Sequence, residues 1–238
     1  MIPFVVTGIP RSGTSIMSKL ICEHVPNAYC LNEVIYRMAL VKHDLLNIGE
    51  ILLETGEAPN KYYDGGLVYN VHENERMEWR KVEKEFDEDL LIGSKVTSPY
   101  LMYIEGLMAQ NLPILGMIRD PLYTIASWLS PQSATMAVAQ VTPDNLSYRW
   151  ENIDFKTEDR YSRSAELWNY LAEKVMKLTL FKYEELSGER RSCGWWDGII
   201  SYIPKIDNFN LKDRYDVDWG KIEEAVEAYA PLRKEFGY

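Results

Sequence analysis

A glycine-rich loop near the start of the chain contains the residue types that bind an anion. Phe4–Ser15 reads FVVTGIPRSGTS, an apolar run followed by glycines, hydroxyl residues and one arginine. Backbone N–H groups at such a turn attract phosphate-like groups, and the positive end of the following helix adds to the attraction. The alternative is an ordinary strand-to-helix turn that uses glycine and serine only for its geometry.

The charge of this loop differs from that of nucleotide hydrolases. Their pattern, G-x-x-x-x-G-K-[ST], places a lysine directly after the second glycine. Gly8 and Gly13 keep this spacing, but Thr14 replaces the lysine and Arg11 carries the cation inside the loop. The pattern predicts an anionic ligand other than a magnesium-bound triphosphate. The hydroxyl donors of the loop are Ser12, Thr14 and Ser15.

A second candidate anion site lies in Ile114–Ser127, ILGMIRDPLYTIAS. Its apolar run leads to Arg119, and Ser127 follows on the predicted next helix, which Pro121 opens. A guanidinium and a hydroxyl suit a phosphate, because the arginine fork matches phosphate geometry. The alternative is that Arg119 pairs with Asp120 or another acid and only stabilises the loop.

Together the two segments resemble the sulfotransferases that use 3′-phosphoadenosine 5′-phosphosulfate as donor. Arg11–Ser15, RSGTS, is similar to the family's [KR]-S-G-T-[ST] signature, which implies contacts to the 5′-phosphosulfate. Arg119, in R-D-P, and Ser127 are similar to its second signature, which implies contacts to the 3′-phosphate. Leu180–Leu186, LFKYEEL, resembles a later segment whose tyrosine lies near the adenine, here Tyr183.

The resemblance also implies catalytic roles. Glu33, in CLNEV, resembles the glutamate base of the tyrosylprotein and several carbohydrate sulfotransferases; the alternative is an acid at a helix N-terminus. Lys95, in GSKVTSPY, is similar to a lysine near the bridging oxygen, where a fixed cation stabilises developing charge; the alternative is an exposed lysine. Arg190 and Arg191 are weaker candidates for the 3′-phosphate, because their glycine spacing departs from the family's late loop.

The expected reaction is therefore metal-independent transfer of a sulfuryl group to an acceptor hydroxyl or amine. Glu33 acts as base, and Arg11 and Lys95 neutralise charge on the phosphosulfate. A small molecule, a carbohydrate, a lipid headgroup and a peptide tyrosine all remain open as acceptors. The alternatives are a P-loop kinase that acts on a small molecule with ATP, and a nucleotide-binding protein that has lost the chemistry.

Strand-like and helix-like segments alternate along the chain. This order predicts a three-layer α/β fold of the P-loop type, with a parallel sheet between helices, in a single domain over 1–238. Ligands in such sheets bind at the carboxyl ends of the strands, where we expect the candidate residues to meet. The expected strands are 2–7, 28–31, 90–94, 114–118 and 178–181, and the expected helices are 15–24, 33–48, 73–88, 99–110, 160–177 and 221–230.

Composition limits the partners and the compartment. The chain has 238 residues and a formal net charge of −10, which argues against a nucleic-acid partner because phosphate backbones need a basic surface. Its 3 cysteines match no zinc spacing and include no C-x-x-C, and reduced thiols suit a cytoplasmic protein. No apolar run approaches the roughly 18 residues of a transmembrane helix.

Overall fold

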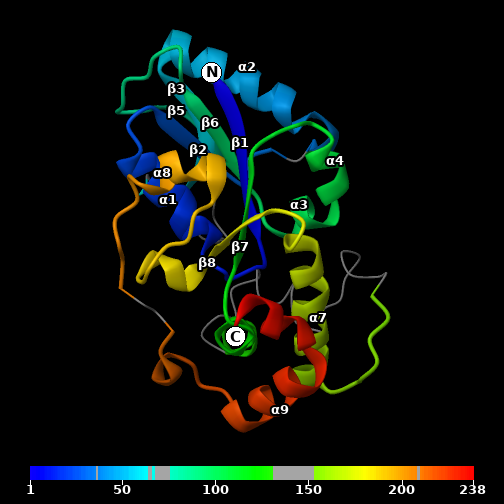
Figure 1. Ribbon diagram of the computed structural model, residues 1–238. Coiled ribbons are helices and arrows are strands. Elements are labelled where there is room, and N and C mark those ends of the chain that lie inside the picture. The colour runs from blue at the N-terminus through cyan, green and yellow to red at the C-terminus, as the bar shows by residue number, and fades with distance from the viewer. Residues whose placement is uncertain (36, 64–65, 68–75, 131–152, 208–209) are drawn as a thin grey trace.

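The computed structural model describes the whole chain except residues 36, 64–65, 68–75, 131–152 and 208–209. Its centre is a sheet of five parallel strands in the order β2-β6-β1-β7-β8 (Figure 1). A mainly parallel sheet surrounded by helices confirms the predicted α/β class. The strands are β1 (Ile2–Gly8), β2 (Ala28–Asn32), β6 (Leu91–Lys95), β7 (Ile114–Ile118) and β8 (Thr179–Lys182).

The two faces of the sheet are covered by different helices. Side chains alternate along β1, so Phe4 and Val6 join one hydrophobic cluster while Val5 joins another. Helices α1 (Thr14–His24) and α8 (Asp197–Ile200) contribute to the cluster of Phe4. On the opposite face lie α2 (Val41–Thr55), α3 (Ser98–Met102) and α7 (Arg160–Val175), as Figure 1 shows.

A further hydrophobic cluster joins the later helices to the end of β7. Trp128 of α5 (Pro121–Leu129) and Trp168 of α7 are both almost fully buried in it. Helix α9 (Trp219–Tyr229) adds Ile222 and Val226, and the 3₁₀ turn η7 (Pro231–Phe236) adds Phe236. None of the described helices has the length and apolar content that a membrane crossing requires.

The predicted helix over 73–88 is wrong. Its described part contains β5 (Arg76–Lys81), which pairs antiparallel with β3 (Glu57–Tyr63). The short strand β4 (Gly66–Leu67) completes this second sheet. The charged residues gave no apolar period with which to distinguish strand from helix, and pairing with β3 decided the outcome.

Two other predicted helices differ in extent. The helix expected from Glu33 begins only at Val41, after the 3₁₀ turn η1 (Met38–Leu40). Glu33 has a left-handed φ of 54°, which a helix cannot contain. The helix expected over 99–110 is divided at Tyr103 into α3 and α4 (Ile104–Met108).

Candidate functional site

The loop after β1 is fixed to the neighbouring strand and helix. The carbonyl of Met117 on β7 accepts hydrogen bonds from the Ile9 N–H at 3.1 Å and from the Ser12 hydroxyl at 3.0 Å. The Trp128 indole donates to the Pro10 carbonyl at 3.1 Å. Ser12 is fully buried, so its hydroxyl supports the loop. Contacts from β7 and α5 therefore hold the loop in one shape.

Two loop residues adopt left-handed backbone. Gly13 has φ 89°, and a Cβ atom there would come within 2.5 Å of the Tyr183 ring, so glycine is required on both counts. Arg11 has φ 71°, which is uncommon for a residue with a side chain. Arg11 and Glu33 are two of the three described non-glycine residues with positive φ, the third being Asn111. Such conformations concentrate at functional sites.

The helix that follows the loop has an N-terminus without a side-chain cap. Gly13 occupies the cap position of α1, and the first turn of this helix contains no acid. By contrast, Asp120 caps α5, Asp159 caps α7 and Asp218 caps α9 through their carboxylates. The uncapped N–H groups and positive end of α1 suit an external anion. Thr14 is buried and Ser15 is half-buried at this same turn.

The two sequence motifs meet through a direct hydrogen bond. The Arg11 Nε donates to the Ser127 hydroxyl on α5 at 3.0 Å. Arg119 follows β7 and donates from Nη1 to the Arg11 carbonyl at 3.4 Å. β1 and β7 are neighbours in the sheet. After β1 the chain forms β2 and β6 on one side of this pair, and after β7 it forms β8 on the other side, so the strand order reverses between β1 and β7. Open α/β sheets bind ligands at such a switch point.

Arg119 is held mainly by polar side chains and aromatic rings. It is 5% exposed, and its Nε donates to Asn210 at 2.7 Å while Nη2 donates to the Tyr215 hydroxyl at 3.2 Å. Its guanidinium lies 4.6 Å from the centre of the Tyr183 ring. Asp120 instead caps α5, where it accepts from the Leu122 N–H at 2.8 Å.

Tyr183 lies between the loop and Arg119. Its ring is 4% exposed and faces Gly13, as the close approach to that glycine requires. Burial raises the pKa of its hydroxyl, and the cation of Arg119 opposes this shift. The predicted contact to adenine stays a prediction, while the described contacts show Tyr183 supporting the loop and Arg119.

Glu33 and Lys95 form a close ion pair at the adjacent end of the sheet. Lys95 Nζ lies 2.7 Å from Glu33 Oε1, with side-chain exposures of 4% and 16%. The Glu33 N–H also donates to the Lys95 carbonyl at 2.8 Å. Lys95 is therefore not an exposed lysine, and Glu33 is not an acid at a helix N-terminus.

The pair and the loop lie on neighbouring strands. Lys95 at the end of β6 is in register with Val6 of β1 and with Asn32 of β2. The Thr7 hydroxyl, one residue before the loop, donates to the Thr97 carbonyl at 3.2 Å. The carboxyl ends of β2, β6, β1 and β7 thus bring all four charged candidates to one edge of the sheet.

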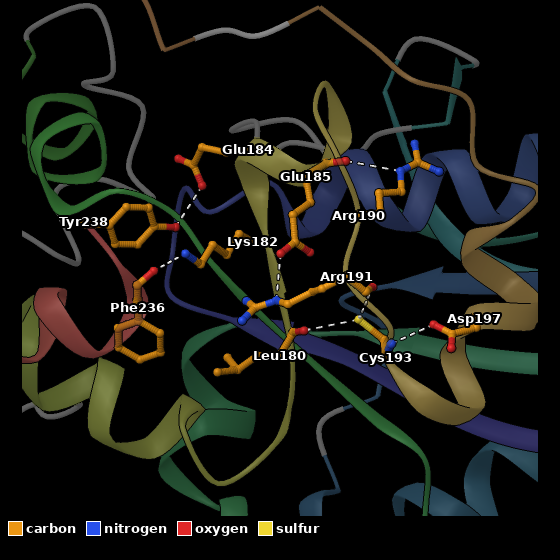
Figure 2. Close-up of polar contacts among 10 residues, drawn as sticks. All are labelled: Leu180, Lys182, Glu184, Glu185, Arg190, Arg191, Cys193, Asp197, Phe236 and Tyr238. Atoms are coloured by element: carbon orange, nitrogen blue, oxygen red, sulfur yellow. Dashed lines mark hydrogen bonds and ion pairs between the residues drawn. The ribbon is translucent and has the colours of Figure 1, made fainter.

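Arg190 and Arg191 serve the local structure after β8 (Figure 2). Arg190 donates to the carbonyls of Glu185, Ile200, Ile203 and Pro204 at 2.7–3.2 Å. Arg191 pairs with the Glu185 carboxylate at 2.7 Å. These contacts fix the segment between η4 (Tyr183–Leu186) and α8.

The sequence did not indicate Asn210 and Tyr215, which lie between α8 and α9. Both are half-buried and contact Arg119. No glycine pattern or periodic apolar run marks this segment, so only its place in the fold reveals the contacts.

The cysteines and the acidic groups show no arrangement typical of metal binding or thiol chemistry. Among the described residues no cluster of His, Cys, Asp or Glu has the geometry to hold a metal ion. All three cysteines are free, and burial raises the pKa of Cys22 to about 11. A thiol with a raised pKa is a poor nucleophile near neutral pH.

Neither a protein-family model nor a curated protein matches this chain.

Proposed function

We propose that this protein is a sulfotransferase of the P-loop type that uses 3′-phosphoadenosine 5′-phosphosulfate. The observation that carries the proposal is the hydrogen bond from Arg11 Nε to the Ser127 hydroxyl at 3.0 Å. It joins the two motifs on which the resemblance rests. A donor with anionic groups on the 3′ and 5′ oxygens of one ribose needs two such neighbouring cations.

In this proposal the loop binds the 5′ end of the donor. The N-terminus of α1 and the backbone N–H groups around Gly13 face the phosphosulfate, with Thr14 and Ser15 beside them. Arg11 supplies the cation of the loop, whereas Ser12 keeps the loop in shape. The uncapped first turn of α1 supports this assignment, because a capping carboxylate would repel the donor.

Arg119 and Ser127 bind the 3′-phosphate, and Tyr183 holds the adenosine side of the pocket. Arg119 presents a planar fork of N–H donors, which suits a phosphate better than a lysine does. Ser127 can turn its hydroxyl proton toward the ligand while it accepts the hydrogen bond from Arg11.

The transfer step takes place at the Glu33–Lys95 pair. The acceptor oxygen attacks sulfur and passes its proton to the Glu33 carboxylate. The bond from sulfur to the bridging oxygen breaks, and adenosine 3′,5′-bisphosphate leaves. Because protonation removes the charge that holds Lys95 at 2.7 Å, the ammonium becomes free to stabilise the oxygen of the leaving phosphate. Acceptors remain a small molecule, a carbohydrate, a lipid headgroup or a peptide tyrosine.

Binding and transfer measured together test the proposal. We expect adenosine 3′,5′-bisphosphate to raise the melting temperature more than ATP with magnesium does. We also expect the protein to move labelled sulfate from the donor to an acceptor in a panel of these four classes. Glu33→Gln should reduce this rate by about 100-fold or more and leave adenosine bisphosphate affinity unchanged.

Two results would contradict the proposal. Stronger stabilisation by ATP with magnesium would favour a small-molecule kinase. Binding of adenosine bisphosphate without transfer to any acceptor class would favour a nucleotide-binding protein that has lost the chemistry. Unchanged transfer in Glu33→Gln would retain the sulfotransferase and require another base.

A further inference from the structure

A line of hydrogen bonds runs from Arg119 to the last residue of the chain. Arg119 Nε donates to Asn210 Oδ1 at 2.7 Å, and Asn210 Nδ2 donates to Glu184 Oε1 at 2.8 Å. The Tyr238 hydroxyl donates to the other oxygen, Glu184 Oε2, at 2.8 Å, as Figure 2 shows. Glu184 lies in Leu180–Leu186, the segment that resembles the family's later motif, whereas Asn210 lies in none of the segments that carry the resemblance.

The chemistry of the groups fixes the direction of every bond in this line. A guanidinium only donates, so the amide oxygen of Asn210 faces Arg119 and its NH₂ faces Glu184. Both carboxylate oxygens of Glu184 then accept, so Tyr238 donates. Burial raises the pKa of the Tyr238 hydroxyl, and the carboxylate of Glu184 raises it further, which keeps the proton in place. The arrangement therefore has one stable orientation.

Glu184 fixes the backbone beside Arg119 as well. Its Oε1 also accepts from the Asp120 N–H at 3.2 Å, directly after the arginine. Tyr238 is itself held in place: Lys182 bonds to the Phe236 carbonyl and lies 4.8 Å from the centre of the Tyr238 ring. One carboxylate thus links the turn after β7 to the end of η7.

Asn210 lies between the positive guanidinium of Arg119 and the negative carboxylate of Glu184. A carboxylate in direct contact with Arg119 would neutralise the positive charge that a phosphate needs. A neutral amide fixes the orientation of the guanidinium without cancelling its charge. We propose that Tyr238, Glu184 and Asn210 are positioning residues that direct Arg119 toward the 3′-phosphate of the donor. This inference rests on the proposed function.

The test compares two ligands that differ only in the 3′-phosphate. Titration calorimetry measures the affinity for adenosine 3′,5′-bisphosphate and for adenosine 5′-monophosphate, and their ratio reports on the 3′-phosphate alone. Tyr238→Phe should lower this ratio about fivefold to tenfold, because the carboxylate loses one donor and Asn210 gains freedom. Asn210→Asp should lower it further, since the new carboxylate pairs with Arg119. Tyr202→Phe, at a tyrosine that is 53% exposed, is the matched control.

The outcomes separate this inference from the proposed function. If Tyr238→Phe and Asn210→Asp weaken both ligands by the same factor, or lower only the melting temperature, the residues are merely structural and the inference is wrong. If the unmodified protein binds both ligands equally or binds neither, the proposed function is wrong and the inference falls with it.

Discussion

Arg119 is buried and Arg190 is half-buried, and the two arginines direct the same kind of donors to different partners. Arg190 directs its N–H groups to four main-chain carbonyls. Among its contacts to the described residues, Arg119 donates to the side chains of Asn210 and Tyr215 and to the Arg11 carbonyl. Main-chain carbonyls of a folded segment cannot turn away one by one, but side chains can change rotamer. The difference separates an arginine that supports the fold from one that can exchange a partner for a ligand.

Removal of Arg119 should have the largest effect on binding. We expect Arg119→Met to weaken adenosine 3′,5′-bisphosphate by about 100-fold, which is about 2.7 kcal/mol, because a charge-assisted fork is lost. Titration calorimetry measures this effect. A change below about threefold would show that the two arginines do not differ in the way proposed.

Removal of Arg190 should lower the stability of the protein and leave its nucleotide affinity unchanged. Arg190→Met removes the guanidinium donor from the carbonyls of Ile200 and Ile203, so we expect a loss of about 2 kcal/mol in the free energy of unfolding. Urea denaturation measures the loss, and nucleotide affinity should stay within twofold. Loss of affinity in a variant that remains fully folded would place Arg190 in the site.

Ser127 should have a smaller effect. Ser127→Ala removes the acceptor of Arg11 Nε, and we expect nucleotide affinity to fall about fivefold, close to 1 kcal/mol. Ser130→Ala is the control, because the buried Ser130 hydroxyl has no hydrogen-bond partner in the described part of the chain. Equal affinities of the two variants would argue that Ser127 takes no part in binding.

Asp120 should show the smallest effect and a dependence on pH. Burial raises the pKa of the Asp120 carboxyl above its ordinary value. The stability contributed by its protonated form is therefore fully present below the unfolded pKa and is lost as the pH rises through the folded pKa. Asp120→Asn keeps a good helix cap, and we expect a gain below about 1 kcal/mol at pH 7 that disappears near pH 4. Urea denaturation at both pH values measures it. A variant that is less stable at pH 7 would contradict this reasoning.

The sequence predicted the parallel strands well because each is a short apolar run with a polar residue at its end. Ile114–Ile118 has the predicted bounds, and the other four strands differ by about one residue. The predicted helix over 73–88 was wrong because pairing with β3 is not local in sequence. Charged residues in that segment fit either structure.

The meeting of the two motifs in the candidate site was predictable, because their chemistry and their spacing point to the same edge of the sheet. Arg11 and Ser127 belong to recognisable motifs, and the sheet topology brings them together. Asn210 and Tyr215 were not predictable, because a long irregular connection carries them to Arg119 and no pattern fixes its path. The pairing of Glu33 with Lys95 likewise depends on β2 lying beside β6.

Asn60 ties the second sheet to the strand that carries Glu33. Its fully buried side chain on β3 accepts from the Asn32 N–H at 2.9 Å and donates to the Tyr29 hydroxyl at 3.2 Å. The small antiparallel sheet is thus bonded to β2 at Asn32, one residue before Glu33. Neither β2 nor β3 leads to Arg11 or Arg119. Under the proposed function, substitutions in that sheet would therefore act on the side of the site that holds Glu33 and leave the strands before Arg11 and Arg119 unchanged.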